Sequence, residues 1–365
     1  MKKRNQVFNW LYLIGILMVI DDHCNSKVGF LTMIFPYDSF FMPLFVFCSG
    51  YFYQKLSFDD CLKKKTKRLL IPYIIWNAVF ILLTLLVNKI FGLYWYTNYQ
   101  LPVWMLSLVY APSSALNNIA WFVVNLFWVS IIYNVIYHFG RQEDNKKKDI
   151  WITIILFLLG LVAIQLCING WMLDDVRGVF LLRVTFYIQF YHYGYLFKKY
   201  FEEMLNKKNS ILICLTCILI NFTLIELFGQ KISFYDTITM NYFSYCFLPI
   251  ITSITGIVFY YELAKTLAKL WSDSKLVDFI ARNTFTIMEM HLLFVNIPNF
   301  YLFLKRNTSM KFSDFNIEEF QNSVWYRYNT TSCIIGFLCG VIGSLIIAYM
   351  IECVKKLYDK KRALE

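Results

Sequence analysis

"IWITIILFLLGLVAIQLCI", residues 150–168, is an unbroken apolar run close to the roughly 20 residues that a helix needs to cross a bilayer. Runs of the same kind occur at 74–87, "IIWNAVFILLTLLV", and at 333–351, "CIIGFLCGVIGSLIIAYMI". Hydrophobic residues make up 58% of the 365 residues and charged residues only 16%, whereas a soluble domain is about half apolar and a quarter charged. The sequence therefore predicts an all-α, polytopic membrane bundle.

Ten segments have the composition of membrane-spanning helices. The predicted spans are 7–24, 34–53, 69–90, 119–139, 150–170, 179–197, 210–228, 242–264, 279–300 and 332–354. Every second connection is basic, and most of the 35 Lys and Arg lie in the N-terminus, 54–68, 140–149, 198–209, 265–275 and 355–362. Because cytoplasmic segments collect Lys and Arg, this alternation predicts about ten transmembrane helices with both termini in the cytoplasm.

The net charge of +11 is explained by this topology, so we expect contacts with membrane lipids and not with nucleic acid. Residues 1–356 are predicted to form one transmembrane domain, followed by a short basic tail at 357–365. The Trp- and Tyr-rich segment 91–118 is expected along the outer membrane interface. The longest polar stretch, 301–331, is expected to cover part of a site. The ten cysteines show no metal-ligand spacing, and no metal site is expected.

The stretch "VIDDHC", residues 19–24, places Asp21, Asp22 and His23 about 21 Å along a helix that starts near Val7. An ionisable side chain at bilayer depth is costly and calls for a reason. For the two acids, a helix end that emerges into water and a functional role are equally good interpretations. For His23 the functional interpretation is favoured.

A second polar island, Glu289 and His291, lies inside the predicted span 279–300. Residues two apart point to different faces of a helix, and we expect at least one of them to face the interior of the bundle. The alternative is a buried hydrogen-bonded pair that only ties helices together. Arg183 is predicted one turn inside the outer end of its helix, where it can snorkel to the interface or offer donors to an anion.

The remaining ionisable residues are expected nearer to water. His192 is predicted to lie at the cytoplasmic interface, and Glu226 and Glu262 at wet ends of spans. In "KKKTKRLLIPY", residues 63–73, Lys65 and Arg68 are three apart and share a helix face. They are predicted either to anchor the next span at anionic lipid or to bind phosphate groups.

Several segments together resemble motifs of the acyltransferase-3 family of integral membrane acyltransferases. These segments are "LIGILMVIDDHC", "MPLFVFCSGYFYQK", "KKKTKRLLIPYIIWN", "AWFVVNLFW", "FYHYGYLFKKY" and "ARNTFTIMEMH". They follow the order of the family's motifs and cover nearly all of the chain. The resemblance implies a membrane-bound O-acyltransferase that moves an acyl group, commonly acetyl, from cytoplasmic acetyl-coenzyme A to a sugar hydroxyl.

The resemblance also implies roles for individual residues. His23 falls on the family's catalytic histidine, and Lys65 and Arg68 fall on its cytoplasmic basic pair, which is associated with the acyl donor. The family has a cation eleven residues before the histidine, whereas this chain has Tyr12 there. Asp22 is a candidate to orient His23.

Glu289 is a second candidate to orient His23, from another helix. Arg183, His291 and Trp121 are candidates to bind the acceptor. The acceptor is expected to be a cell-surface or lipid-linked glycan, and the location the bacterial cytoplasmic membrane.

Two other functions remain open at this point. A transporter or flippase for glycans or small solutes would also have about ten spans with a few buried charges, but it is often built from internal repeats, and none is evident. A non-catalytic relative of the acyltransferases would be compatible with the missing cation at Tyr12. Labelled acetyl-coenzyme A distinguishes the three, because only an enzyme acylates a glycan and only a transporter moves one unmodified.

Overall fold

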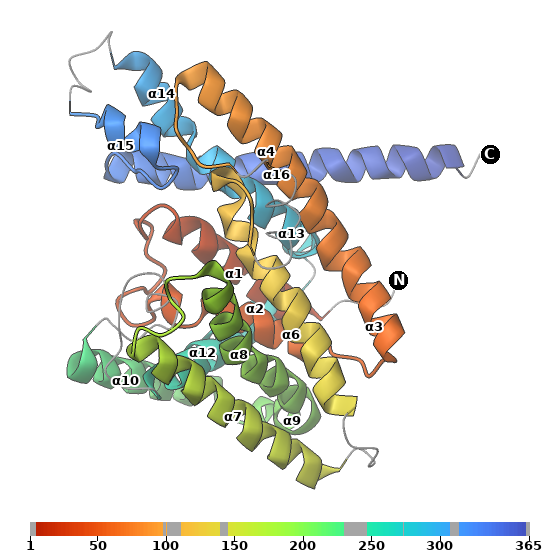
Figure 1. Cartoon of the computed structure of the whole chain (residues 1–365). Coiled ribbons are helices and arrows are strands. Elements are labelled where there is room, and N and C mark those ends of the chain that lie inside the picture. The colour runs from red at the N-terminus through yellow and green to blue at the C-terminus, as the bar shows by residue number, and fades with distance from the viewer. Residues whose placement is uncertain are drawn as a thin grey trace.

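The computed structural model describes residues 5–97, 100, 111–138, 145–229, 247–272, 274–306 and 314–362, and the regular elements in these ranges are helices (Figure 1). An isolated β-bridge joins Thr97 to Ser114. The longer helices are α1 (Gln6–Asp22), α2 (Phe41–Tyr51), α4 (Ile71–Phe91), α6 (Trp121–His138), α7 (Lys146–Ile168), α8 (Val176–Leu196), α10 (Ser210–Phe228), α12 (Leu248–Leu270), α13 (Lys275–Val295) and α16 (Thr330–Arg362).

Each of the ten predicted spans overlaps one of these helices. Within the described ranges, six helical segments are long and apolar enough to cross a membrane: Phe58–Phe91, Ala115–His138, Lys146–Ile168, Ser210–Phe228, Lys275–Lys305 and Thr330–Lys360. Residues 242–246 of the eighth predicted span lie outside the described ranges, as do 98–99 and 101–110 of the expected interfacial segment. The all-helical membrane architecture is confirmed, while ten crossings and cytoplasmic termini stay predictions.

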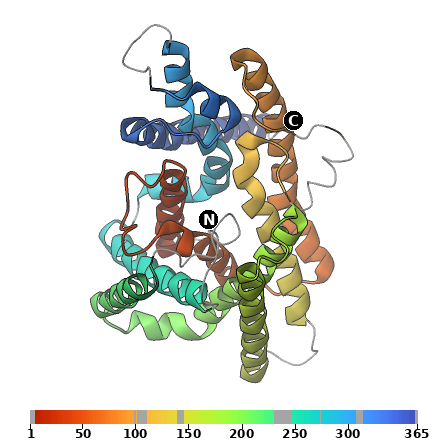
Figure 2. The same cartoon turned by 60° about the vertical axis from the view of Figure 1, so that its left-hand side comes forward.

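Helices α1 and α2 lie in the middle of the molecule, with the other helices around them (Figures 1 and 2). α1 packs against α12 and α13, and α2 packs against α8. On the periphery, α4 and α10 expose large apolar side chains, among them Leu82, Leu86, Leu215 and Leu219. An apolar outer surface around a tightly packed interior is the arrangement that a lipid environment requires.

The described chain ends lie at the same end of the bundle. Gln6 and Asn9 at the start of α1 donate to Asp278 in the first turn of α13, at 3.0 and 2.7 Å. Glu352, in the last third of α16, accepts from Asn283 of α13 at 2.7 Å. α13 therefore ties both ends together, as expected if both face the cytoplasm.

The second predicted span is wrong in its extent. Only Phe41–Tyr51 of residues 34–53 is α-helix, and it is too short to cross a bilayer by itself. The preceding residues form a loop and a 3₁₀ turn, Tyr37–Ser39. This loop continues the irregular segment after α1, in which Asn25, Ser26, Gly29 and Leu31 have positive φ angles. All of α2 except Ser49 is buried, so the helix belongs to the centre of the bundle.

The third predicted span starts too late. The basic segment before it is helical: α3 (Phe58–Lys65) continues through a π-helical turn, Thr66–Leu70, into α4. Ser57 begins α3 by accepting a hydrogen bond from the backbone N–H of Asp60. The lysines of this segment therefore project from a rigid helix and not from a flexible loop.

The loop after α1 is organised by the side chain of Asp21. The carboxylate accepts hydrogen bonds from the backbone N–H groups of Val28 and Gly29, both at 2.9 Å, and from the hydroxyl of Tyr37 at 2.8 Å. The Tyr37 hydroxyl in turn accepts from the N–H of Phe30 at 2.7 Å. Asp21 is fully buried, so the interpretation of this acid as an exposed helix end is wrong.

Two glycines set the close approach of α2 and α8. A Cβ atom at Gly50 would overlap the carbonyl of Tyr191, and one at Gly194 would overlap the carbonyl of Phe47. In both cases the obstacle is backbone, which cannot rotate away as a side chain can. Small residues that let helix backbones approach closely are typical of membrane helix interfaces.

We predict that Gly194→Ala lowers the stability of the folded protein by about 3 kcal/mol, because the added methyl group forces α2 and α8 apart. Thermal unfolding in detergent measures the loss. Gly15→Ala is the matched control, since the added Cβ would meet only the ring of Phe45, and it should cost less than about 1 kcal/mol. Equal stability of the two variants would contradict this account of the helix contact.

We also predict that Asp21→Asn lowers stability by about 2 kcal/mol, because the amide replaces one charged acceptor oxygen with a donor that faces other donors. The same unfolding assay measures it. Asp174→Asn, in the exposed turn before α8, should change stability by less than about 0.5 kcal/mol. An Asp21→Asn variant as stable as this control would show that the loop does not depend on the carboxylate.

Candidate active site

His23 directly follows the last turn of α1, and its ring lies between two aromatic neighbours. The ring centroid of His291, from α13, is 5.2 Å away, with the two rings 12° from parallel. The ring centroid of Trp325, from the loop before α16, is 5.1 Å away at an angle of 43°. Three segments far apart in the sequence therefore meet at His23.

Arg327 fastens the loop of Trp325 to the end of α1. Its Nε donates to the backbone carbonyl of His23 at 2.7 Å. Its Nη1 donates to the side chain of Asn296 at 3.2 Å and to the carbonyl of Tyr326 at 2.7 Å. Hydrogen bonds that involve a charged donor are the stronger ones in proteins, so this side chain holds the loop and His23 in one arrangement.

The two residues of the second polar island point in different directions, as predicted. His291 faces His23, and its Nδ1 lies 3.2 Å from the carbonyl of Ile287. Because a carbonyl only accepts, Nδ1 carries the hydrogen and Nε2 is left as a buried acceptor, for which no partner is present in the described ranges.

Glu289 is also fully buried, and neither carboxylate oxygen has a hydrogen-bond partner among the described residues. Its electrostatic neighbour is Tyr73 of α4. The structure thus brings His291, and not Glu289, to the imidazole of His23.

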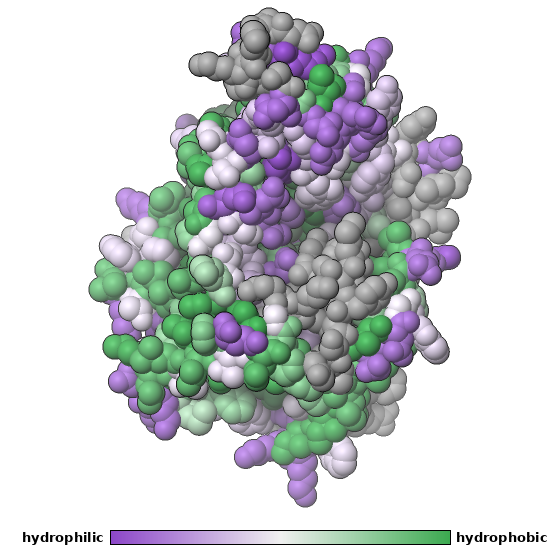
Figure 3. All heavy atoms as spheres, turned by 90° about the vertical axis from the view of Figure 1, so that its left-hand side faces the viewer, coloured by the Kyte–Doolittle hydropathy of each residue, from purple (hydrophilic) through white to green (hydrophobic). Residues whose placement is uncertain are grey.

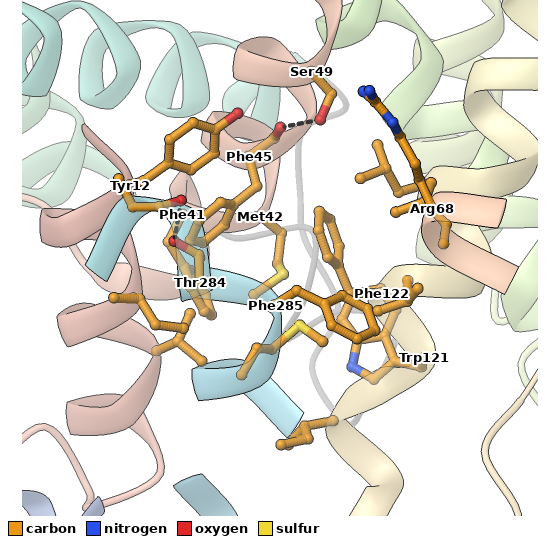
Figure 4. Close-up of a pocket in the computed structure, with 18 of the residues that line it drawn as sticks. Tyr12, Phe41, Met42, Phe45, Ser49, Arg68, Trp121, Phe122, Thr284 and Phe285 are labelled. Carbon is orange, nitrogen blue, oxygen red and sulfur yellow. Dashed lines mark hydrogen bonds between the residues drawn. The ribbon is translucent and has the colours of Figure 1, made fainter. Parts of the chain in front are cut away.

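A cavity of about 430 Å³ lies on one side of His23 and is called the His23 cavity here. Its walls come from α1, α2, the start of α6 and α13, and they are mainly aromatic and apolar. Figure 4 shows Phe41, Met42, Phe122, Phe285 and Trp121 along it, with Ser49 and the Arg68 guanidinium at one end.

A second cavity of about 600 Å³, the basic cavity, opens between the start of α1 and the ends of α2, α3 and α8. Four cations line it, Lys64, Lys65, Arg68 and Lys198, and none of its described lining residues is acidic. Lys65 donates to the hydroxyl of Tyr191 at 3.4 Å, and the Lys198 ammonium lies 5.3 Å from the ring centroid of Tyr51. This cavity has the charge to hold an anionic ligand.

The two cavities are adjacent, and the residues that they share are called the neck here. Both are lined by Tyr12, Ser49, Arg68, Leu69 and Leu126. The predicted basic pair is therefore divided, because Lys65 lines only the basic cavity, whereas Arg68 lies at the neck. A guanidinium from the helix before α4 thus stands at the level of Tyr12, the position of α1 where a cation was expected.

Two of the predicted acceptor-binding residues stack on each other. The guanidinium carbon of Arg183 lies 3.9 Å from the centroid of the Trp121 ring, within the range of a cation–π contact. Trp121 lines the His23 cavity, whereas Arg183 lies behind it on α8. Arg183 is two turns inside the described start of α8 and not one turn as predicted.

Two further predictions about exposure are wrong. His192 is fully buried, and its ring nitrogens contact the hydroxyls of Tyr133 at 2.9 Å and Thr153 at 3.0 Å. Glu262 is fully buried in an ion pair with Lys265. Both residues lie at the end of an apolar run, which suggested that their side chains reach water. Instead, His192 is bound by side chains of α6 and α7, and Glu262 is buried with Lys265 of its own helix.

Sequence reasoning missed Lys198, Trp325 and Arg327. Lys198 belongs to a basic segment between two helices, and such segments indicate the cytoplasmic side of the membrane and not a binding site. The loop of Trp325 and Arg327 was expected to cover a site, but no local pattern marks which of its residues face His23. A contact between residues about 300 positions apart, such as that of Arg327 with His23, leaves no pattern in a single sequence.

Comparison with known proteins identifies the family of the chain. No curated protein and no solved structure matches the chain. The family model of the acyltransferase domain of the acyltransferase-3 family matches residues 5–353, which is nearly the whole chain. The match includes α1 with His23, both cavities and the loop of Arg327. The chain belongs to the acyltransferase-3 family, which supports acyltransferase activity in an integral membrane protein.

Proposed function

We propose that this protein is a membrane-bound O-acyltransferase that uses cytoplasmic acetyl-coenzyme A as the donor and a hydroxyl of a cell-surface or lipid-linked glycan as the acceptor. The observation that carries the proposal is the neck. Because the basic cavity and the His23 cavity share five lining residues, one extended molecule can reach from the lysines to His23.

Coenzyme A has the shape and charge for this path. Its phosphate groups are at one end and its thioester is at the other, joined by a long flexible arm. The phosphates match Lys64, Lys65 and Lys198, which act as point charges at the mouth. Arg68 at the neck is placed for hydrogen bonds to the amide oxygens of the arm, and the apolar walls of the His23 cavity suit the acyl group.

The length of α1 sets the distance that the donor covers. From Gln6 to Asp22 the helix rises about 25 Å, so the phosphate end and the reacting end lie near opposite faces of the bundle. In this arrangement the acyl group reaches the outer side while coenzyme A stays bound from the cytoplasm. The location would be the bacterial cytoplasmic membrane.

The proposed reaction needs one base. His23 accepts the proton of the acceptor hydroxyl, the hydroxyl oxygen bonds to the acyl carbonyl carbon, and the carbon–sulfur bond breaks. The departing thiolate of coenzyme A takes up the proton from the imidazolium. Imidazole suits both steps, because its ordinary pKa is near neutrality. Asp22 remains a predicted candidate to orient His23, whereas neither carboxylate oxygen of Glu289 has a hydrogen-bond partner among the described residues.

We predict that His23→Gln lowers acetyl transfer about 1,000-fold, since the amide cannot act as a base. The assay follows label from acetyl-coenzyme A into glycan in membranes that contain the full chain. His138→Gln, at the end of α6 and outside both cavities, is the control and should keep full activity. Transfer at the wild-type rate by His23→Gln would overturn the assignment, and movement of unmodified glycan without acylation would indicate a transporter.

We further predict that Lys65→Gln and Lys198→Gln each raise the KM for acetyl-coenzyme A about tenfold, because each removes a charge-assisted contact to phosphate. The same substitutions should leave the KM for S-acetylpantetheine, which lacks the phosphates, within twofold. Lys269→Gln, exposed at the end of α12, should change neither. Equal effects on both donors would show that these lysines do not bind phosphate.

A further inference from the structure

We propose that Trp325 is the surface on which a pyranose ring of the acceptor stacks, so that a ring hydroxyl is presented to His23. The inference rests on the proposed function and specifies its acceptor as a cyclic sugar bound through one face. It is based on the position of the Trp325 indole, which is exposed and whose ring centroid lies 5.1 Å from that of the His23 imidazole. Arg327 fixes the loop of Trp325 to the end of α1.

His23 stands between two separate environments. It lines the cavity that is proposed for the donor, whereas Trp325 is not among the residues that line that cavity. The indole therefore lies beside the imidazole but outside the lining of that cavity. Two substrates that react at one base need two approaches, and the one beside Trp325 is left for the acceptor.

The backbone around Trp325 displays the indole outward. Val324 is 3% exposed and Tyr326 is 8% exposed, while Trp325 between them is 39% exposed. The backbone N–H of Trp325 donates to Ser323 Oγ at 3.2 Å, and Arg327 binds the carbonyls on both sides, of Val324 at 3.1 Å and Tyr326 at 2.7 Å. The indole is thus held in place before any acceptor arrives, which reduces the cost of binding.

The surface that contains this loop is polar. Seen from the left-hand side of Figure 1, hydrophilic residues gather around α14 (Ile297–Lys305) and α15 (Ile317–Asn322) and border a hollow near the middle of the face (Figure 3). The lower part of the same face is more hydrophobic. Since α15 directly precedes the loop of Trp325 in the chain, a polar acceptor would meet the protein near this loop.

The chemistry of the indole favours a cyclic sugar over a linear polyol. Its face is flat, apolar and electron-rich, and the face of a pyranose carries C–H groups that bear slight positive charge. The hydroxyls point outward from the sugar's edge, where one of them can reach the adjacent imidazole. A linear polyol offers the same hydroxyls but no flat face, so it would gain nothing from the indole.

The test compares two acceptors with the purified full chain in lipid nanodiscs and labelled acetyl-coenzyme A. The ring acceptors are the octyl β-glycosides of glucose, galactose and N-acetylglucosamine, and the linear acceptor is mannitol. Trp325→Ala should raise the KM for the best glycoside about tenfold, equivalent to about 1.4 kcal/mol. The KM for acetyl-coenzyme A should stay within twofold, and any loss of rate with mannitol should be several times smaller than the loss with the glycoside.

Two further variants separate stacking from a structural role. Trp325→Phe keeps an aromatic face and the packing on His23, and should raise the glycoside KM only two- to threefold. Trp171→Ala removes an exposed indole in the turn between α7 and α8, and should change nothing.

An equal loss with glycoside and mannitol in Trp325→Ala, or no loss with either, would overturn the inference. So would wild-type transfer to mannitol but to no glycoside, which leaves the proposed acyl transfer standing. Absence of acetyl transfer from the wild-type chain to any acceptor, glycan in native membranes included, would instead remove the proposed function itself.

Discussion

The buried carboxylate of Asp21 is the interaction on which the site depends. It binds two backbone N–H groups and one tyrosine hydroxyl of the following loop, and thereby fixes where α1 ends. His23 comes two residues later, so its position follows from that end. A buried charge is tolerated only with several hydrogen-bond donors around it, and this loop supplies them.

Two features of the site meet at this end of α1, the His23 cavity and the loop of Trp325. On one side, the apolar cavity leads past Tyr12, Ser49 and Arg68 to the lysines of the basic cavity. On the other side, Arg327 holds the loop of Trp325 against the same backbone. The cations of the basic cavity and Arg68 lie at the mouth and neck, whereas His23 has the rings of His291 and Trp325 beside it and the Arg327 guanidinium on its backbone carbonyl.

Much of the site could be predicted, because the relevant residues are chemically unusual for their surroundings. A histidine and a cationic pair within or beside apolar runs stand out in one sequence, and His23, Lys65 and Arg68 do line the two cavities. The partners of His23 could not be predicted. His291 and Trp325 come from positions hundreds of residues away, and nothing local shows that their helix and loop pack there.

Predictions about burial succeeded where apolar periodicity decides it and failed where single polar groups decide it. His192 and Glu262 were expected near water because they end apolar runs, yet both are buried, His192 with hydroxyl partners from α6 and α7 and Glu262 with Lys265 of its own helix. Asp21 could not be distinguished from an exposed acid for the same reason. A hydrogen bond between separate segments depends on how the helices pack, and the pattern along one helix does not contain that information.

By itself the sequence determined the class of the protein: an all-helical membrane bundle of the acyltransferase-3 family, because hydrophobic run length and the order of short motifs are local properties. Tertiary structure decided the shortness of α2, the neck at Arg68 and the neighbours of His23. Each of these depends on contacts between distant segments, where close packing and hydrogen-bond satisfaction select one arrangement of helices.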